Sequence, residues 1–302
     1  MALCNITEYC SDAVLAIEVS LGCIGTVGNL LVVCTIVCVN FLHNYTNYFI
    51  AHLSVADALV CISIQVFQFR YLPPALVNSA TCLLFFARVP FFVFLSVSSF
   101  ATLCLHAERY IAIVQPLQYP RLVTPAKVKC LLAAIWIVSI LTSLFETTSS
   151  LTYDESYNVC YITDPDATWK AAFVTLKGVI LTGQLVGTIV PYVRIMANLR
   201  ECAIRQDNLR VDELLEARRR VARLLLFTAL AYYLTWIPVA VVYVLLTFGV
   251  IVDPTYYDVT DIILLANSVV NPFIYAFKYK EFRKGFAKMC RMGANRVHPV
   301  EF

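Results

Sequence analysis

The chain has 302 residues, of which 60% are hydrophobic and 14% are charged, and its mean hydropathy is +0.74. Soluble domains contain about 25% charged residues, so this composition excludes an ordinary soluble protein and indicates a membrane protein. The net charge of +3 gives no indication of nucleic-acid binding. The sequence also contains no His, Cys or acidic cluster with metal-ligand spacing and no Gly-rich phosphate loop.

Seven apolar stretches are each long enough to cross a bilayer core, which takes about 20 helical residues. In chain order they are Ala13–Val39, Asn47–Tyr71, Cys82–Val114, Val128–Ser149, Ala171–Met196, Val221–Phe248 and Val259–Phe277. The sequence therefore predicts an all-α membrane protein, a seven-transmembrane helix bundle between residues 13 and 278, with the first helix as its own insertion signal. The mixed-charge segment 201–216 is expected to extend the fifth and sixth helices.

Positively charged residues of a membrane protein gather on the cytoplasmic side. Arginines crowd the segment between the fifth and sixth stretches, and lysines and arginines crowd the C-terminus, whereas residues 1–12 contain neither. We therefore expect residues 1–12 to be extracellular and the C-terminus to be cytoplasmic. Asn5, in the sequon Asn5-Ile6-Thr7, is then a candidate for glycosylation.

Residues 279–302 are expected to form a short amphipathic helix on the membrane surface and a short cytoplasmic tail. Phe277, Phe282 and Phe286 alternate with lysines and arginines after the seventh stretch, a pattern typical of a basic helix on the inner leaflet. Cys290 is a candidate for palmitoylation, with an unmodified thiol as the alternative.

Short motifs occur along the seven stretches in a specific order. They are Gly28-Asn29-Leu30-Leu31-Val32, Leu53-Ser54-Val55-Ala56-Asp57, Glu108-Arg109-Tyr110 followed by Pro116-Leu117, Trp136, Thr235-Trp236-Ile237-Pro238 and Asn267-Ser268-Val269-Val270-Asn271-Pro272-Phe273-Ile274-Tyr275. In this order they resemble those of the rhodopsin-like (class A) G-protein-coupled receptors, and the resemblance covers all seven stretches and the helix after them.

The resemblance implies a receptor in which an extracellular ligand shifts an inactive–active equilibrium. A Glu-Arg pair at the end of a membrane-length helix is costly in hydrocarbon unless it faces protein or water, which agrees with a role for Glu108 and Arg109. In the family, Arg109 would contact the C-terminal helix of a heterotrimeric G protein and Leu117 would insert into that protein. The implied coupling and activation residues are Glu108, Arg109, Tyr110, Leu117, Tyr192, Trp236, Pro238, Asn271, Pro272 and Tyr275.

Asp57 is a lone carboxylate in the middle of the second stretch, where it must be neutralised or solvated inside the bundle. The resemblance implies the family's internal sodium site, in which oxygen atoms surround this carboxylate. Here they would come from Ser98, Asn267 and Asn271. The alternative is a protonated Asp57 held by Asn29.

The resemblance also implies a disulfide between Cys82 and Cys160. Cys82 lies 27 residues before Arg109, a longer separation than is usual in the family, and Pro90 is expected to mark a bulge that absorbs the difference. Cys4 and Cys10 form a second candidate pair.

The ligand is less well defined by the sequence. Phe91 stands near the position where amine receptors carry an Asp, and Leu265 where opsins carry a Lys, so a biogenic amine or retinal is not expected. The candidate pocket residues are Arg88, Phe91, Phe92, Lys177, Trp236 and Tyr243. Buried cations favour a carboxylate on the ligand, but Arg88 or Lys177 pairing with Glu146 or loop acids is an equal alternative, and acidic outer loops suit a cationic peptide.

Three positions depart from the family pattern. Gln184 replaces the usual proline of helix five, Tyr232 replaces the common phenylalanine of helix six, and Arg218 replaces the acid that locks Arg109 in some members. Because Arg218 and Arg109 are like charges, we expect a weakened inactive state and measurable basal signalling.

The sequence thus predicts a plasma-membrane receptor that is not an enzyme and needs no cofactor beyond an allosteric sodium ion. Its expected partners are a heterotrimeric G protein, an extracellular ligand and the bilayer, with arrestin as a further candidate, but no nucleic acid. The alternatives are an odorant-type chemoreceptor of the same superfamily or, in another class, a seven-helix ion or proton transporter.

Overall fold

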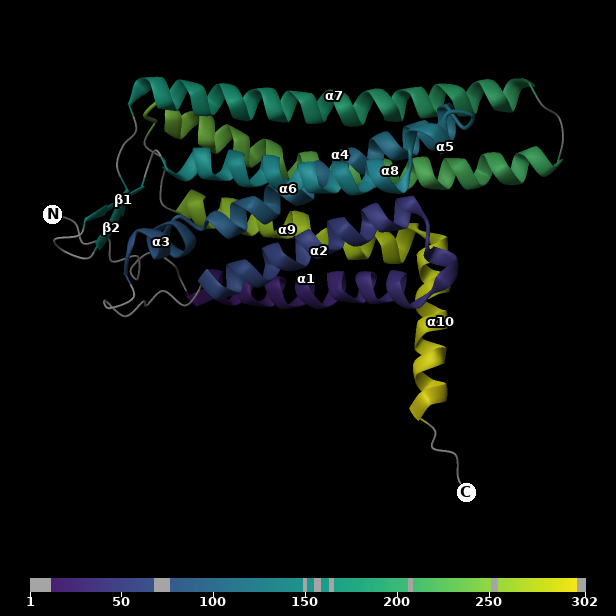
Figure 1. The fold of residues 1–302 in the computed structure, drawn as a ribbon, viewed down its shortest axis with the longest axis horizontal. Helices are drawn as coiled ribbons and strands as arrows, with labels where there is room; N and C mark the ends of the chain where they lie inside the picture. Colours follow the sequence, from purple (N-terminus) through teal and green to yellow (C-terminus); the bar gives the residue numbers. More distant parts are fainter. Residues whose placement is uncertain are drawn as a thin grey trace.

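The computed structural model describes residues 12–67, 77–148, 151–154, 159–162, 166–205, 209–250 and 255–297. Seven long helices run side by side in an elongated bundle (Figure 1), and all are long and apolar enough to cross a membrane. They are α1 (Asp12–Cys38), α2 (Tyr45–Phe67), α4 (Val89–Val114), α6 (Pro125–Thr148), α7 (Ala167–Arg205), α8 (Leu209–Thr247) and α9 (Thr255–Lys278). The predicted fold class is confirmed.

Six of the long helices contact one another in a closed ring, and α6 joins this ring mainly through α4. α1 contacts α2 and α9, α2 contacts α4 and α9, α4 contacts α6 and α7, α7 contacts α8, and α8 contacts α9. The approach of α1 to α9 depends on Gly28, because a Cβ atom there would lie 3.2 Å from the ring atoms of Pro272. The bundle has two ends, which we call the disulfide end, at Cys82, and the Arg109 end.

At the disulfide end, the predicted start of the third membrane helix at Cys82 is wrong. A short helix α3 (Ser79–Thr81) and a π-helical turn η4 (Cys82–Phe86) come first, and α4 begins at Val89 after Arg88. Arg88 has a left-handed backbone, with φ of 52°, which breaks the helix. Pro90 lies in the first turn of α4, where its missing N–H costs no hydrogen bond, rather than in a bulge within the helix.

The connection between α6 and α7 contains an antiparallel hairpin of β1 (Leu151–Asp154) and β2 (Val159–Ile162). Cys160 on β2 forms a disulfide with Cys82, with Cα atoms 5.7 Å apart, as predicted. The disulfide therefore fixes the hairpin to the π-helical turn that precedes α4. Cys4, Cys10 and Asn5 lie outside the described residues.

At the Arg109 end, α7 and α8 extend well beyond the other bundle helices (Figure 1). Each has 39 residues, which corresponds to roughly 58 Å at 1.5 Å per residue. The predicted helical extension through the mixed-charge segment is confirmed as far as Arg205 and from Leu209 onward. Both helices contain an internal proline, Pro191 in α7 and Pro238 in α8.

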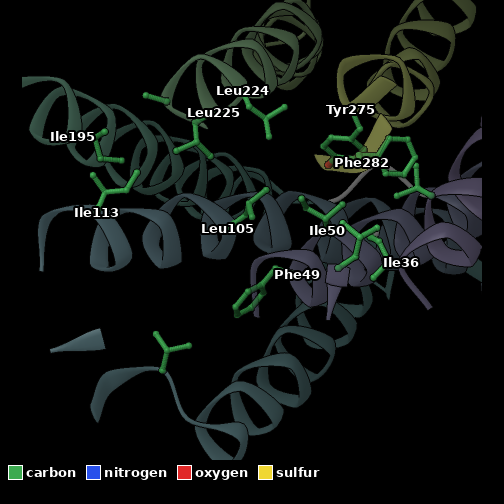
Figure 2. Close-up of a cluster of buried hydrophobic side chains, with 14 of the residues drawn as sticks. Ile36, Phe49, Ile50, Leu105, Ile113, Ile195, Leu224, Leu225, Tyr275 and Phe282 are labelled. Atoms are coloured by element: carbon green, nitrogen blue, oxygen red, sulfur yellow. The ribbon is translucent and has the colours of Figure 1, made fainter. Parts of the chain in front are cut away.

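The largest buried apolar cluster closes the bundle at the Arg109 end. Figure 2 shows side chains from α1, α2, α4, α7, α8 and α9 in this cluster, among them Leu105, Ile195, Leu225 and Tyr275. Phe282 of α10 (Lys280–Val297) joins the cluster beside Tyr275, with ring centroids 6.5 Å apart. This contact anchors α10, which leaves the bundle at a large angle (Figure 1).

Candidate functional site

The Glu108–Arg109 pair lies at the Arg109 end of α4 as two oppositely charged neighbours in direct contact. Arg109 donates from Nε to Oε2 of Glu108 and from Nη2 to Oε1, both at 2.6 Å. Two parallel N–H donors make this a bidentate pair, which is stronger and more directional than a single contact. Glu108 is almost fully buried and Arg109 is about one-fifth exposed.

Two hydroxyl groups complete the environment of Glu108. Thr46 on α2 donates to the carboxylate at 3.2 Å, and Tyr119 on the short helix α5 (Tyr119–Leu122) donates to Oε1 at 2.6 Å. Burial, followed by the hydrogen bond to Glu108 and its charge, raises the pKa of Tyr119. The phenol therefore stays protonated and remains a donor at physiological pH.

Within the described part of the chain, the ion-pair partner of Arg109 is its neighbour Glu108 rather than a residue of α8. A different contact joins α4 to α8 one turn away. His106 is fully buried, with Nδ1 2.8 Å from the carbonyl oxygen of Thr102 and Nε2 3.1 Å from that of Leu225. Both neighbours are acceptors, so a neutral imidazole, which carries one N–H, satisfies only one of them.

The other predicted coupling residues differ in their exposure. Leu117, in the turn after α4, is 95% exposed, which is unusual for a large apolar side chain. Tyr110 and Tyr192 are half-buried on α4 and α7. Tyr275 is fully buried, and its hydroxyl has no hydrogen-bond partner among the residues that the structure describes.

Asp57 lies fully buried in the centre of the bundle and accepts two hydrogen bonds. Ser98 on α4 donates to Oδ1 at 2.6 Å, and the Asn271 amide on α9 donates to Oδ2 at 2.8 Å. Three helices thus meet at this carboxylate. Asn271 immediately precedes Pro272, which lies within α9, so the polar contact sits next to the proline that removes a backbone hydrogen bond.

The two remaining residues that were considered around Asp57 contact other groups. The side-chain oxygen of Asn267 accepts a hydrogen bond from Thr235 on α8 at 3.2 Å. Asn29 donates to the backbone carbonyls of Gly25 and Ser268, both at 2.9 Å. Asn29 therefore links α1 to α9. The alternative of a protonated Asp57 required a hydrogen bond from Asn29 to Asp57, and the Asn29 amide donates to other groups.

A second buried polar cluster joins α4, α7 and α8. Gln184 donates to Ser99 at 2.5 Å, the Ser99 and Tyr232 hydroxyls are 2.7 Å apart, and Tyr232 donates to the Gln184 side-chain oxygen. We call these three residues the Gln184 triad. All three side chains are buried, so their mutual hydrogen bonds replace those lost to water.

Trp236 lies one turn along α8 from the Gln184 triad. Its ring centroid is 5.6 Å from that of Tyr232, and it packs against the apolar cluster of α2, α4, α8 and α9. Its indole N–H is buried and has no partner among the described residues. Pro238, two residues later, lies inside the continuous helix α8 and is exposed.

At the disulfide end, Arg88 forms an ion pair with Asp261 of α9, with Nη1 and Oδ2 2.5 Å apart. The structure thus gives Arg88 an ion-pair partner on the seventh membrane helix. The side chain of Glu146, the partner named in the alternative reading, lies outside the described residues. Burial alone would lower the pKa of Arg88, but the charge and hydrogen bond of Asp261, and then the charge of Glu18, raise it. The guanidinium therefore stays charged.

The remaining pocket candidates separate into two groups. Phe91 is fully buried in the core and contacts half-buried Phe92 edge-to-face, with centroids 5.4 Å apart. On α7, the ammonium of Lys177 lies 5.9 Å from the ring of Phe173, whose centroid is 6.4 Å from that of Tyr243. Phe173 thus connects Lys177 to Tyr243, and Tyr243 also lies close enough to Arg88 to interact with it electrostatically.

The sequence reasoning missed four residues of this polar interior: Glu18, Ser99, His106 and Asp261. Glu18 and His106 are single polar residues within apolar stretches, which was a usable signal. Ser99 and Asp261 carry no such signal, because their importance depends on which residue faces them. Cys290, the palmitoylation candidate, is exposed on α10.

Comparison with known proteins gives a consistent result. Residues 28–275 match the family model described as "7 transmembrane receptor (rhodopsin family)". The chain is 28% identical to rat (Rattus norvegicus) somatostatin receptor type 4 over 277 residues, which cover 88% of this chain and 69% of the relative. It is 28% identical to rat galanin receptor type 2, covering 88% and 73%, and 25% identical to bovine (Bos taurus) G-protein coupled receptor 52, covering 87% and 76%.

Proposed function

The chain belongs to the rhodopsin family of seven-transmembrane receptors, and on this premise we propose that it activates a heterotrimeric G protein when a ligand binds at the disulfide end. It is a multi-pass membrane receptor and not an enzyme. The observation that carries the proposal is the Glu108–Arg109 pair, held by Thr46 and Tyr119 at one end of the bundle. Exposed Leu117 lies beside that end, in the turn after α4.

The proposed topology places the Arg109 end in the cytoplasm of a cell whose plasma membrane the bundle crosses. Residues 1–12 would be extracellular with a glycan on Asn5, residues 13–278 would form the receptor domain, and residues 279–302 would form the surface helix and tail with palmitate on Cys290. An N-terminal epitope accessible on intact cells, and a mobility shift lost in Asn5→Gln, test the orientation. Loss of hydroxylamine-sensitive acylation in Cys290→Ser tests the lipid.

In the proposed mechanism, the structure corresponds to the inactive arrangement. The apolar cluster around Leu105 and Leu225 joins α4 to α8, and activation would separate these helices beside Arg109 and admit the C-terminal helix of the G protein. Pro238 and Pro272 are suitable pivots, because each removes a backbone hydrogen bond from its helix. Trp236, packed on Tyr232, would pass a change in the ligand pocket to the Gln184 triad.

A sodium ion fits the residues around Asp57 in part. The Asp57 carboxylate and the Ser98 hydroxyl are hard oxygen donors in contact with one another, and Asn271 would complete the set by turning its amide oxygen toward the ion. Asn267 could contribute its side-chain oxygen to the ion only after losing the hydrogen bond that this oxygen accepts from Thr235. The ion would supply a positive charge that balances a buried carboxylate, and so would favour the inactive arrangement.

We propose that the ligand is a peptide or a small molecule that carries a carboxylate. Arg88 supplies a charged, one-third exposed guanidinium for such a group, and the relatives named for somatostatin and galanin favour a peptide. The proposed pocket contains Arg88, Lys177, Tyr243 and Trp236, with Phe92 on its wall. Arrestin is a further proposed partner of the Arg109 end.

The decisive experiment compares G-protein activation by the wild type and Arg109→Ala at matched surface expression. We expect basal activation above that of empty-vector cells and a decrease of roughly tenfold or more in Arg109→Ala, since truncating a buried charged contact costs about 2–5 kcal/mol. Leu117→Ala should also reduce activation. Arg121→Ala, which removes an exposed cation from α5 at the same end, is the control, and an equal decrease in Arg121→Ala would contradict the role of Arg109.

A further inference from the structure

Helix α7 combines three features that weaken its backbone within about two turns. Pro191 lies inside this helix and has no N–H, so the carbonyl of Gly187, four residues earlier, loses its helical hydrogen bond. Gly187 is itself a poor helix former, because it has no side chain to restrict its backbone. The hydroxyl of Thr188 donates to the carbonyl of Gln184 at 2.9 Å, and a bond of this kind often bends a helix. We call residues 187–191 the α7 hinge.

The half of α7 on the disulfide side of the hinge is fixed to two other helices. Gln184 donates to Ser99 of α4 at 2.5 Å, and Tyr232 of α8 donates to Gln184. All three side chains are buried, so a broken bond would leave a polar group without water to replace the lost partner. Gln184 also stands where the family pattern has a proline, so this chain has no proline-induced weak point at that turn.

At the hinge, α7 lies directly against α4. A Cβ atom on Gly187 would overlap Cδ1 of Leu103, so the close approach depends on the missing side chain. Gly183, one turn earlier, differs, because a Cβ atom there would meet no described atom within 4 Å. The weak turn of α7 is therefore the turn that rests on α4, which is the arrangement expected of a pivot.

The segment of α7 beyond the hinge, residues 192–205, belongs to the Arg109 end. Ile195 and Leu199 are fully buried in the apolar cluster there. Apolar contacts of this kind are non-directional, so a second arrangement can re-form them. Half-buried Tyr192 directly follows Pro191, and the whole segment is roughly 21 Å long at 1.5 Å per residue. Its last turns run past the other bundle helices (Figure 1).

We propose that α7 bends at this hinge when the receptor is activated, so that residues 192–205 turn about Leu103 while residues 167–186 stay in place. A bend of about 20°, the size of a proline kink, would displace the far end of the segment by roughly 7 Å. Tyr192 would turn with the segment, and Gly187 and Pro191 are positioning residues for it. The role of the hinge in activation rests on the receptor function proposed above.

The hinge favours the active arrangement because it lowers the free energy needed to bend α7. In the structure α7 is one uninterrupted helix, and this form belongs to the inactive arrangement. A two-state equilibrium shifts toward the state whose relative free energy falls. Pro191→Ala restores an N–H that can donate to the carbonyl of Gly187, so it should favour the unbent helix and lower basal activity.

The first test measures distances by double electron–electron resonance on the full chain in phosphatidylcholine nanodiscs, without G protein. Spin labels attached to p-acetylphenylalanine leave the native cysteines in place. One label replaces Lys129 on α6, and the other replaces either Arg200, beyond the hinge, or Thr182, before it; all three residues are exposed. We expect two populations that differ by up to about 5 Å for the Lys129 and Arg200 labels, and one population for the Lys129 and Thr182 labels.

The second test compares Pro191→Ala with Gly183→Ala as a matched control. Both changes replace a poor helix former of α7 by alanine, but Gly183 lies outside the hinge and has open space for the added methyl group. Pro191→Ala should remove the second distance population and lower basal nucleotide exchange on an added G protein by roughly twofold to tenfold, the range that one hydrogen bond is worth. Gly183→Ala should change neither quantity.

Three results would overturn the hinge. A single population for both label pairs would mean that α7 does not bend, and two populations for both pairs would mean that the helix tilts as a whole. Equal effects of Pro191→Ala and Gly183→Ala would mean that only the general helix propensity of α7 matters.

The distances are measured without G protein, so they are separate from the test of the receptor function. Loss of the second population in Pro191→Ala without a decrease in nucleotide exchange would leave the hinge standing and overturn its role in activation. Absence of nucleotide exchange in the wild type and in both variants, with two populations present in the wild type, would count against the receptor function alone.

Discussion

The guanidinium of Arg88 and the carboxylate of Asp261 lie 2.5 Å apart and tie the start of α4 to the first turns of α9. Both side chains are partly exposed, at 33% and 23%, and an ion pair open to water contributes only about 0–1 kcal/mol. A ligand can therefore replace either partner at little cost. The pair offers one group of each sign, so the charge of the ligand decides which residue it contacts.

The first prediction concerns the sign of the ligand. For a peptide or small molecule found by screening on G-protein activation, Arg88→Gln should raise the half-maximal concentration by roughly tenfold or more, as loss of a charge-assisted contact predicts. Asp261→Asn should change it little or lower it, because Arg88 is then released. The opposite ranking of the two variants would mean that the ligand is a cation bound by Asp261.

The second prediction concerns the Gln184 triad. Tyr232→Phe removes the hydroxyl that donates to Gln184 and lies against Ser99, and leaves a buried amide oxygen short of a donor at a cost of about 1–3 kcal/mol. Because the triad joins α8 to α4 and α7, we expect higher basal activity and a lower melting temperature. Tyr233→Phe, which removes only a contact to Thr188, is the control, and identical effects would argue against the triad.

The third prediction concerns His106, whose Nε2 lies 3.1 Å from the carbonyl oxygen of Leu225 on α8. In the tautomer that carries its proton on Nε2, this contact is an interhelical hydrogen bond worth about 0.5–1.5 kcal/mol, and His106→Leu removes it while leaving an apolar side chain in its place. Basal activation should rise by roughly twofold to tenfold. His52→Leu removes the acceptor for Trp136 between α2 and α6 and should affect stability rather than basal activity. Unchanged basal activity in His106→Leu would remove this residue from the switch.

The fourth prediction concerns Arg218, which by resemblance occupies the position of an acid that locks Arg109. Wild-type basal activity should exceed that of empty-vector cells at matched surface expression. Arg218→Glu should lower it by supplying an opposite charge for Arg109, whereas Arg219→Glu, on an exposed neighbour, should not. Wild-type basal activation no higher than that of empty-vector cells would contradict the prediction of a weakened inactive state.

The fifth prediction concerns sodium at Asp57. Basal activation should be lower in sodium than in potassium buffer of the same ionic strength, since the smaller ion suits a compact set of hard oxygen ligands. Asp57→Asn should abolish the difference. Glu18→Gln removes another buried carboxyl group of the bundle and should preserve it. Equal activity of the wild type in both buffers would exclude a functional sodium site.

Much of the fold could be predicted from the sequence, because apolar stretches of membrane length identify helices directly. The start of α4 could not, since the apolar run is continuous from Cys82 and hides the π-helical turn and the left-handed Arg88. Asp57 with Ser98 and Asn271 was predicted as a group and is found together. Asn267 contacts Thr235 of α8 instead, and this neighbour depends on how α8 packs against α9, which the sequence alone does not specify.

The polar links between helices were the least predictable part of the site. Gln184 and Tyr232 were identified only as departures from a family pattern, and Ser99 was not singled out. Their hydrogen bonds depend on the packing of three helices distant in sequence. Asp261 was missed for the same reason, since its importance depends on the position of Arg88, which is 173 residues away in the sequence.

The length of α8 has a mechanical consequence. From Pro238 to its first residue, Leu209, the helix extends for roughly 44 Å, and a tilt of about 10° at the proline would displace its far end by about 8 Å. The segment is thus a lever whose pivot lies two residues from Trp236 and whose arm carries Arg220 and Arg223. A change of under an ångström around the indole is magnified several-fold at the membrane surface, where the cations of α8 meet those of α10.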